Sequence, residues 1–164
     1  MDALAPPRVG VDRLSFEDFY AGEYDRVLAS AYAFCRHREA ALDATQEAFA
    51  RAFSRWRRLG KEEWAGAWVT TTALNLLRGR WRRMHLSLPA PEPPPTTPSA
   101  FPIDLLGALK SLPVRQRQAA TLFYVADLPV TVVARSMGLS EGTIKSHLSR
   151  ARDALRARLG EDHG

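Results

Sequence analysis

The residue types that usually carry out catalysis are scattered in this chain of 164 residues. It has no glycine-rich phosphate loop, no HExxH pair and no cluster of cysteine and histidine with metal-ligand spacing. The single cysteine, Cys35, lies among apolar residues, which favours a buried structural thiol over a nucleophile. The sequence therefore predicts no catalytic centre and no cofactor. The side chains that do gather are basic.

One basic cluster lies in MGLSEGTIKSHLSRARDALRARLG, residues 137–160, which has the pattern of a turn followed by the second helix of a helix-turn-helix. Ser140 is a good N-cap for that helix. Its apolar face holds Ile144, Leu148, Ala151 and Leu155. Its outward face is small, polar and basic, with Gly142, Lys145, Ser146, Ser149 and Arg150.

Gly142 is the informative residue of this helix. Glycine costs about 1 kcal/mol relative to alanine in a helix interior, but a bare backbone lets the first turns approach DNA base edges closely. The helix N-terminus also offers free N–H groups to a phosphate. The pattern favours DNA recognition, and an amphipathic bundle helix with solvated arginines is the alternative.

A second basic cluster lies in LNLLRGRWRRM, residues 74–84, where four arginines surround Trp81. Arginines interleaved with an aromatic ring suit a nucleic-acid backbone and an exposed base. A solvated helix end, where arginine favours the negative dipole, explains the cluster equally well. Upstream, Asp43 and Gln46 lie on one side of a helix, which indicates either a protein contact or a plain solvated face.

Helical periodicity predicts an all-α fold of two small domains. Ser15 should cap the first helix, and helices follow over about 39–58 and 63–84, then 103–112, 112–128, 129–137 and 141–159. The inward stripe of the second helix is expected to hold Leu42, Thr45, Phe49, Ala52, Phe53 and Trp56.

Proline punctuates the chain between the two domains. Residues 87–102, SLPAPEPPPTTPSAFP, should form an extended, semi-rigid linker, although a ligand for a peptide-binding module is possible on composition alone. The predicted boundaries are a flexible N-terminus over 1–14, an N-terminal helical domain over 15–86, a linker over 87–103, a helix-turn-helix domain over 104–160 and a tail over 161–164.

The overall charge agrees with an anionic partner. The formal net charge is +5 and the sequence pI is about 9.9, which favours nucleic acid, an acidic membrane face or an acidic protein. A basic surface that serves only solubility is the alternative. No signal-peptide pattern and no stretch of membrane-spanning length is present, so we expect a cytoplasmic protein with no direct membrane insertion.

Two long stretches resemble the extracytoplasmic-function (ECF) sigma factors of bacterial RNA polymerase, in the sigma-70 superfamily. Residues 112–156, LPVRQRQAATLFYVADLPVTVVARSMGLSEGTIKSHLSRARDALR, resemble their promoter-binding C-terminal domain, with GTIKSHLSRAR as the most specific element. ALDATQEAFARAFSRW (41–56) followed by AWVTTTALNLLRGRWRR (67–83) resembles their N-terminal domain. The resemblance covers about residues 16–159, with the two domains and the linker in the same order.

The resemblance implies a sigma subunit that binds core RNA polymerase through its clamp and flap surfaces and directs it to promoters, without catalysis of its own. The implied clamp contacts are Asp43, Gln46 and Glu47. The implied contacts with the −35 element are Gly142, Thr143, Lys145, Ser146, Ser149, Arg150 and Arg117. The implied contacts with the melted −10 element are Trp64, Asn75, Arg78, Arg80, Arg82 and Arg83. An anti-sigma factor that clamps both domains is the expected regulatory partner.

Two departures from the family pattern affect these expectations. Many relatives have an acidic residue where this chain has Val133, and an aspartate where it has Gly79. The second departure predicts a more basic −10 surface. Two other classes of function remain: a stand-alone helix-turn-helix regulator, which would need a sensor or dimerisation domain, and an enzyme with a helix-turn-helix appendage, which would need a catalytic set.

Overall fold

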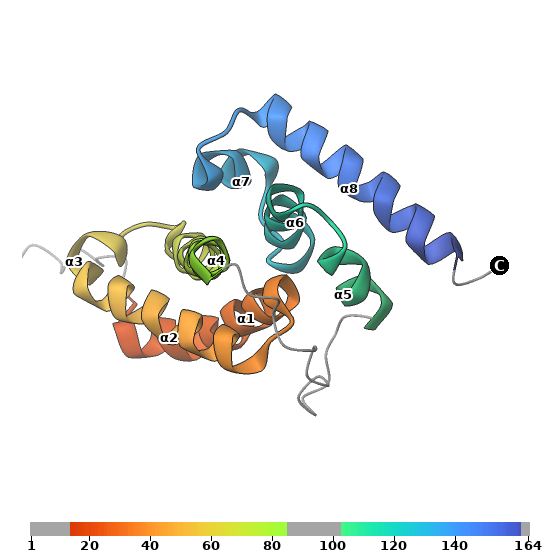
Figure 1. Ribbon diagram of the computed structural model, residues 1–164. Helices are drawn as coiled ribbons and strands as arrows, with labels where there is room; N and C mark the ends of the chain where they lie inside the picture. The colour runs from red at the N-terminus through yellow and green to blue at the C-terminus, as the bar shows by residue number, and fades with distance from the viewer. Residues whose placement is uncertain (1–13, 85–102, 162–164) are drawn as a thin grey trace, which may run out of the picture.

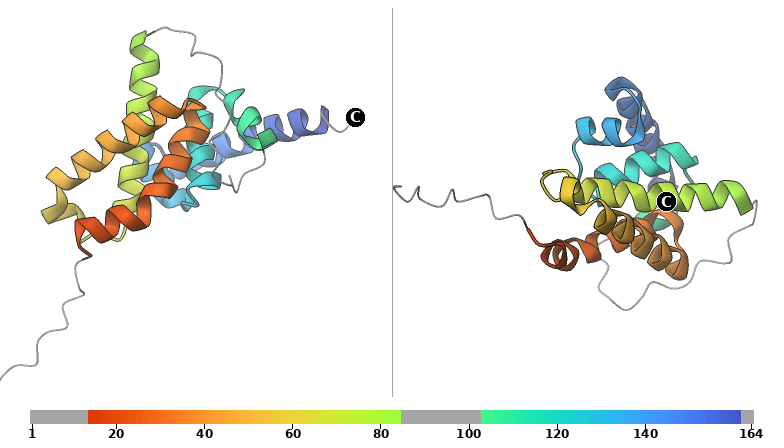
Figure 2. Two further views of the ribbon diagram at one scale, coloured as in Figure 1. Left: turned by 90° about the horizontal axis from the view of Figure 1, so that it is seen from below. Right: turned by 90° about the vertical axis from the view of Figure 1, so that its left-hand side faces the viewer.

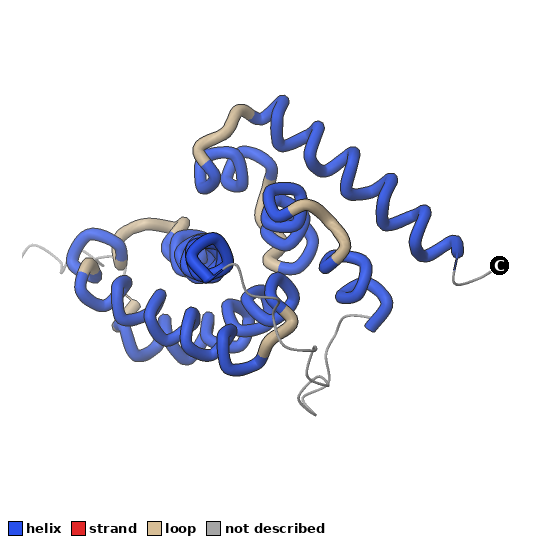
Figure 3. Tube along the Cα trace, in the orientation of Figure 1, coloured by secondary structure: helices blue, strands red, loops and turns tan. Residues whose placement is uncertain are grey.

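The computed structural model describes residues 14–84 and 103–161, with side chains over 14–80 and 107–158. Every regular element in these ranges is helical, which confirms the all-α prediction (Figure 3). The elements are α1 (Phe16–Cys35), α2 (Arg38–Ser54), α3 (Trp56–Leu59), α4 (Ala65–Met84), α5 (Ile103–Lys110), α6 (Val114–Ala120), the π-helical turn η1 (Thr121–Val125), α7 (Val130–Met137) and α8 (Glu141–Glu161). Nearly all of the predicted linker lies outside the described residues.

The N-terminal half consists of α1, α2 and α4 packed against one another, with α3 joining α2 to the segment before α4 (Figure 1). The core side of α2 is largely alanine, whose small side chain lets neighbouring helices approach closely; Ala41, Ala44, Ala48 and Ala52 are all fully buried. Phe34, Phe49 and Leu74 fill the space between the helices. As predicted, α1 begins at a Ser15 cap, where the Oγ accepts a hydrogen bond from the Asp18 N–H at 3.1 Å.

The prediction of one helix over 39–58 is wrong in its last turn. Helix α2 ends at Ser54, because Arg55 leaves the helical region with φ −111° and ψ 11° before α3 begins. Phe53, expected on the inward stripe, is 63% exposed. Its ring packs at the edge of the core, edge-on against Phe16 with the ring centroids 5.0 Å apart, and not inside it.

The C-terminal half departs from a regular helix where one continuous helix was expected over 112–128. After α6 the chain widens into η1, in which the Ala126 N–H donates to the Thr121 carbonyl, five residues back, at 3.0 Å. The helix-turn-helix follows as predicted. Helix α7 ends at Gly138, whose φ of 66° is left-handed, and Ser140 caps α8 by accepting from the Thr143 N–H at 3.1 Å.

Clusters of buried apolar side chains join the two halves. Helix α4 lies between a layer formed by α1 and α2 and a layer formed by α6, α7 and α8 (Figure 2). The same buried cluster takes members from α1, α4, η1, α7 and α8, among them Val27, Leu74, Leu122, Val133 and Ile144. The sequence predicted two domains but not this packing of one against the other.

Two glycines of the helix-turn-helix should respond in opposite ways to alanine. At Gly138 a Cβ would meet no atom within 4 Å, but the left-handed φ strains any L side chain, so Gly138→Ala should lower the free energy of unfolding by about 1 kcal/mol. At Gly142 a Cβ would meet only the Ser140 Oγ at 3.9 Å, without left-handed strain, so Gly142→Ala should be neutral or stabilising. Urea unfolding measures both, and equal stability of the two variants would contradict the assignment.

Candidate nucleic-acid interface

Helix α8 presents the small, basic face that the sequence predicted. Ile144, Leu148, Ala151 and Leu155 are buried, which fixes the rotation of the helix. The predicted contacts on the opposite face are all exposed: Gly142, Thr143, Lys145, Ser146, Ser149 and Arg150. Nothing inside the chain requires a glycine at 142, since a Cβ there would have room. Packing within the chain therefore does not account for the glycine at this position.

The charge of this face comes from lysine and arginine rather than from histidine. Burial lowers the pKa of His147, and the nearby Arg115 and Arg150 lower it further. The imidazole is consequently neutral near pH 7. Lys145 and Arg150, together with Arg152 further along α8, are exposed to solvent and available to an anionic partner.

The second predicted contact region lies on α4, and it already has a partner. The Gln118 Nε2 donates to the Asn75 Oδ1 at 2.8 Å, and the Gln118 Oε1 accepts from the Arg78 Nη1 at 3.1 Å. Gln118 comes from α6 in the other half of the chain and is fully buried. Asn75 keeps an exposed side, whereas Arg78 is half-buried. We call these two hydrogen bonds the Gln118 bridge.

The remaining predicted −10 contacts are partly resolved. Trp64, just before α4, is 43% exposed. Arg80 is half-buried, with its Nη1 3.8 Å from a carboxylate oxygen of Asp43 on α2. Arg82 and Arg83 have side chains outside the described residues.

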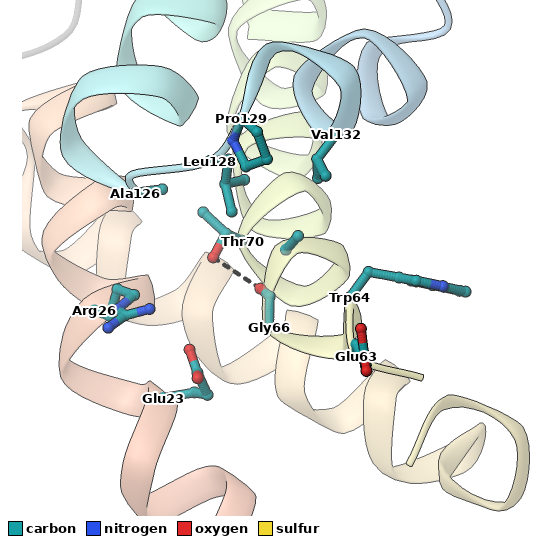
Figure 4. A pocket seen from close by; sticks show the side chains of 11 residues that line it. Glu23, Arg26, Glu63, Trp64, Gly66, Thr70, Ala126, Leu128, Pro129 and Val132 are labelled. Carbon is teal, nitrogen blue, oxygen red and sulfur yellow. Dashed lines mark hydrogen bonds between the residues drawn. The ribbon is translucent and has the colours of Figure 1, made fainter. Parts of the chain in front are cut away.

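Trp64 borders a hollow of about 400 Å³ between α1, the start of α4 and the segment that leads into α7. Figure 4 shows Glu23 and Arg26 on one side and Leu128 and Pro129 on the other, with Trp64 directed outward. A second hollow of about 290 Å³ lies between α4 and α7, and Trp64 and Asn75 line it. The aromatic ring is therefore placed at the mouth of the cleft between the two halves.

The three predicted polymerase contacts lie together on the exposed side of α2. Asp43, Gln46 and Glu47 are all exposed. The Gln46 Nε2 donates to the hydroxyls of Tyr20 and Tyr24 at 3.4 and 3.5 Å, and Glu47 pairs with Arg51 at 3.0 Å. This face is remote from α8, which packs against α5, α6 and α7 on the other side of the molecule (Figure 1).

The structure corrects the prediction for Arg117, which is 5% exposed and cannot reach DNA in this arrangement. Its guanidinium donates to three backbone carbonyls: Phe34 at 3.3 Å, Lys110 at 3.0 Å and Leu112 at 3.1 Å. Burial lowers the pKa of this arginine, but an arginine remains charged in proteins. Arg117 is thus a structural cation that joins the ends of α1 and α5.

Sequence reasoning missed Gln118 altogether. The available signal was a polar residue next to Ala119 and Ala120, on the side of α6 that must face inward. Its partners lie 40 and 43 residues away in the chain. No local pattern identifies such partners.

Comparisons with known proteins match both halves. Residues 19–85 match the family model for sigma-70 region 2, and residues 103–155 match that for sigma-70 region 4. The chain belongs to the ECF sigma factors. These proteins direct RNA polymerase to promoters, and a match to region 2 over the N-terminal half excludes the stand-alone regulator.

Several relatives match this chain over most of its length. The chain is 29% identical to the RNA polymerase sigma-E factor of Streptomyces coelicolor, over 89% of this chain and 86% of that protein. It is 27% identical to the ECF RNA polymerase sigma factor SigM of Mycobacterium tuberculosis, over 96% and 83%. It is 30% identical to the ECF RNA polymerase sigma factor SigE of Mycolicibacterium smegmatis, over 90% of this chain and 62% of that protein.

Solved structures share the fold. The sigma factor RpoE of Bartonella quintana, bound to the anti-sigma factor NepR, superposes with a TM-score of 0.74 at 24% identity, over 88% of this chain and 96% of that one. CnrH, bound to the cytosolic domain of CnrY, superposes with a TM-score of 0.66 at 21% identity, over 90% of this chain and 88% of that one.

Among the described residues, no helix is both long and apolar enough to span a membrane.

The role of Arg117 can be tested by stability. Arg117→Met keeps the length of the side chain but leaves three buried carbonyls without their donor, so the free energy of unfolding should fall by about 2 kcal/mol or more. Arg152→Met, on the exposed face of α8, is the matched control and should change stability by less than about 0.5 kcal/mol. Equal melting temperatures for the two variants would return Arg117 to the candidate DNA contacts.

Proposed function

We propose that this sigma factor uses three separate faces: α2 for the clamp of core RNA polymerase, α8 for the −35 element, and α4 with Trp64 for the −10 strand. The observation that carries the proposal is the occurrence of regions 2 and 4 in one chain. The exposure of the candidate residues on α2 and α8 supports it. The polymerase supplies all nucleotide chemistry, and the sigma factor acts as a non-enzymatic subunit in the cytoplasm.

The −35 element would be bound as duplex by the first turns of α8. Gly142 leaves the backbone free to approach base edges, while Ser146, Ser149 and Lys145 offer hydrogen bonds to bases and phosphates. The charge of Arg150 and Arg152 adds affinity that falls as salt rises, because binding releases counterions from the DNA. Affinity of the free protein is therefore expected to be weak and strongly salt-dependent.

The −10 element would be bound as a single strand. Capturing an unstacked base repays part of the few kcal/mol that unstacking and unpairing cost. Trp64, exposed at the mouth of the cleft, offers a stacking surface. Asn75 offers both an acceptor and a donor to a base edge, and Arg78 and Arg80 offer positive charge to the backbone.

An anti-sigma factor is a natural partner of such a protein. Of the structures that share the fold, RpoE of Bartonella quintana was solved with the anti-sigma factor NepR, and CnrH with the cytosolic domain of CnrY. A partner that covers α2 or α4 would compete directly with polymerase or DNA. Purification of the chain from its native cells at modest salt would reveal such a protein by co-elution.

The direct test of the proposed function is reconstitution with core RNA polymerase. Co-elution at modest salt, followed by run-off transcription and mapping of start sites, should define a set of promoters with common −35 and −10 sequences. A chain that neither associates with core polymerase nor supports specific initiation would overturn the proposal.

Asp43→Arg should weaken polymerase binding at least tenfold without unfolding the protein, because it reverses charge at the centre of the exposed α2 face. The lost contact with Arg80 is long and exposed, so it contributes little to stability. Asp25→Arg, exposed on α1, is the matched charge control. Fluorescence anisotropy of the labelled sigma factor with core polymerase gives both affinities; identical values would refute the clamp assignment.

Gly142→Leu should reduce transcription from a −35-dependent promoter roughly tenfold, as expected for the loss of one to two base contacts. Polymerase binding should be unchanged, since α8 is remote from α2. Gly142→Ala serves as the graded control and should have a smaller effect. Unaltered promoter use by the leucine variant, measured by run-off transcription on a mapped promoter, would remove Gly142 from the DNA face.

A further inference from the structure

The two candidate reading surfaces differ in their state within the free sigma factor. The −35 face of α8 is open to solvent along its first turns. On α4, by contrast, Asn75 and Arg78 are hydrogen-bonded to Gln118 of α6. The C-terminal half therefore contacts the residues that are proposed to bind the −10 strand. The −35 face of α8 is directed away from this contact.

The Gln118 bridge engages the atoms that base recognition needs. An asparagine reads a base edge with both ends of its amide, using the oxygen as acceptor and the nitrogen as donor. Here the Asn75 Oδ1 accepts from Gln118 at 2.8 Å, although Asn75 as a whole is exposed. The Arg78 Nη1 donates to the other end of the same glutamine at 3.1 Å. A base that approached the Asn75 Oδ1 and the Arg78 Nη1 from the side that Gln118 occupies would have to displace it.

The bridge is held in place by its surroundings. Gln118 is fully buried, and the adjacent Arg117 fixes α6 to the end of α1 through the Phe34 carbonyl. Helices α4 and α7 also make apolar contact beside the bridge, with Leu74, Val133 and Ala134 in one buried cluster. A buried polar side chain with both ends paired specifies one arrangement of its partners, since any other leaves them without hydrogen bonds.

We propose that the Gln118 bridge is an autoinhibitory contact: in the free sigma factor it engages the −10-binding side chains Asn75 and Arg78, and α4 takes up single-stranded DNA only after the C-terminal half has moved away. Duplex binding by α8 needs no such movement. The inference rests on the proposed function for its assignment of Asn75 and Arg78 to −10 DNA.

A distance measurement on the full chain tests the proposal. Spin labels at Ser54→Cys on α2 and Ala154→Cys on α8 report the separation of the two halves, and both sites are exposed. The native Cys35, which is 7% exposed, is replaced by alanine in every labelled chain so that only the two introduced cysteines react. Pulsed electron paramagnetic resonance of the free protein should give one narrow distance distribution.

Gln118→Met keeps the length of the side chain and removes both hydrogen bonds of the bridge. It should raise the ratio of open to closed molecules at least tenfold, seen as a second, longer distance. The matched control is Gln116→Met on the same helix, because Gln116 makes no side-chain hydrogen bond to α4 in the described part of the chain. The control should keep the distribution of the parent protein.

A mixed-sequence single strand of 20 nucleotides at low salt provides the second readout. Saturating strand should shift the parent protein to the longer distance, and Gln118→Met should bind the strand at least threefold more tightly than the parent or Gln116→Met. This titration of the parent protein decides the question even if Gln118→Met does not fold.

Three results would each overturn the proposal: a broad or long distribution in the free parent protein, a folded Gln118→Met that stays closed, or strand bound while the short distance persists. None of these depends on polymerase. A chain that initiates transcription yet is open when free would refute only the bridge. A chain that is closed and opens on the strand, but does not bind core polymerase, would refute only the proposed function.

Discussion

The arrangement of the two halves depends on one buried cation. The guanidinium of Arg117 is removed from water, and a buried charge is tolerated only where acceptors replace the lost hydration. The acceptors are carbonyls at the ends of α1 and α5, where a helix leaves its last carbonyls without partners and carries partial negative charge. Because α1 has no basic residue in its own last turn, Arg117 supplies that charge from the other half of the chain. The same hydrogen bonds therefore stabilise the buried cation and the ends of the two helices, and they fix the position of α6.

Once α6 is fixed, the chemistry of the cleft follows. Gln118, which follows Arg117 on α6, forms a hydrogen bond with Asn75 in the middle of α4. The π-helical turn then places Leu122 in the core that α1 and α4 share. Contacts between domains of one chain are commonly polar and permit relative motion. The contact between the two halves of this chain combines an apolar cluster with the hydrogen bonds of Gln118. Separating the halves therefore costs free energy, but the polar groups that are released can form hydrogen bonds with water. The molecule accordingly keeps one DNA-facing surface free and the other engaged within a single body.

What the sequence predicted well was local or periodic. Ser15 and Ser140 are caps whose partners lie three residues on, and the rotation of α8 follows from the spacing of Ile144, Leu148, Ala151 and Leu155. What it missed depends on residues that meet from far apart: Arg117 bonds to Phe34 across 83 positions, and Gln118 to Asn75 across 43. A basic residue beside a recognition motif was assigned to DNA because charge alone does not distinguish an exposed arginine from one that caps distant helices. The break at Arg55 is likewise a tertiary effect, since nothing in the residues on either side ends a helix.

The π-helical turn has a consequence for how this chain tolerates change. A turn closed by a bond over five residues holds one residue more than an α-helical turn, and each residue of an α-helix corresponds to about 100° of rotation. The extra residue in Thr121–Val125 thus sets the rotation of α6 relative to the helix-turn-helix that follows. Deleting one residue there would let the helix relax to regular geometry, yet it would turn α6 away from α4 relative to the helix-turn-helix that follows. Length in this segment is consequently under tighter constraint than residue identity, whereas an exposed loop of the same size could gain or lose a residue without effect on the rest of the fold.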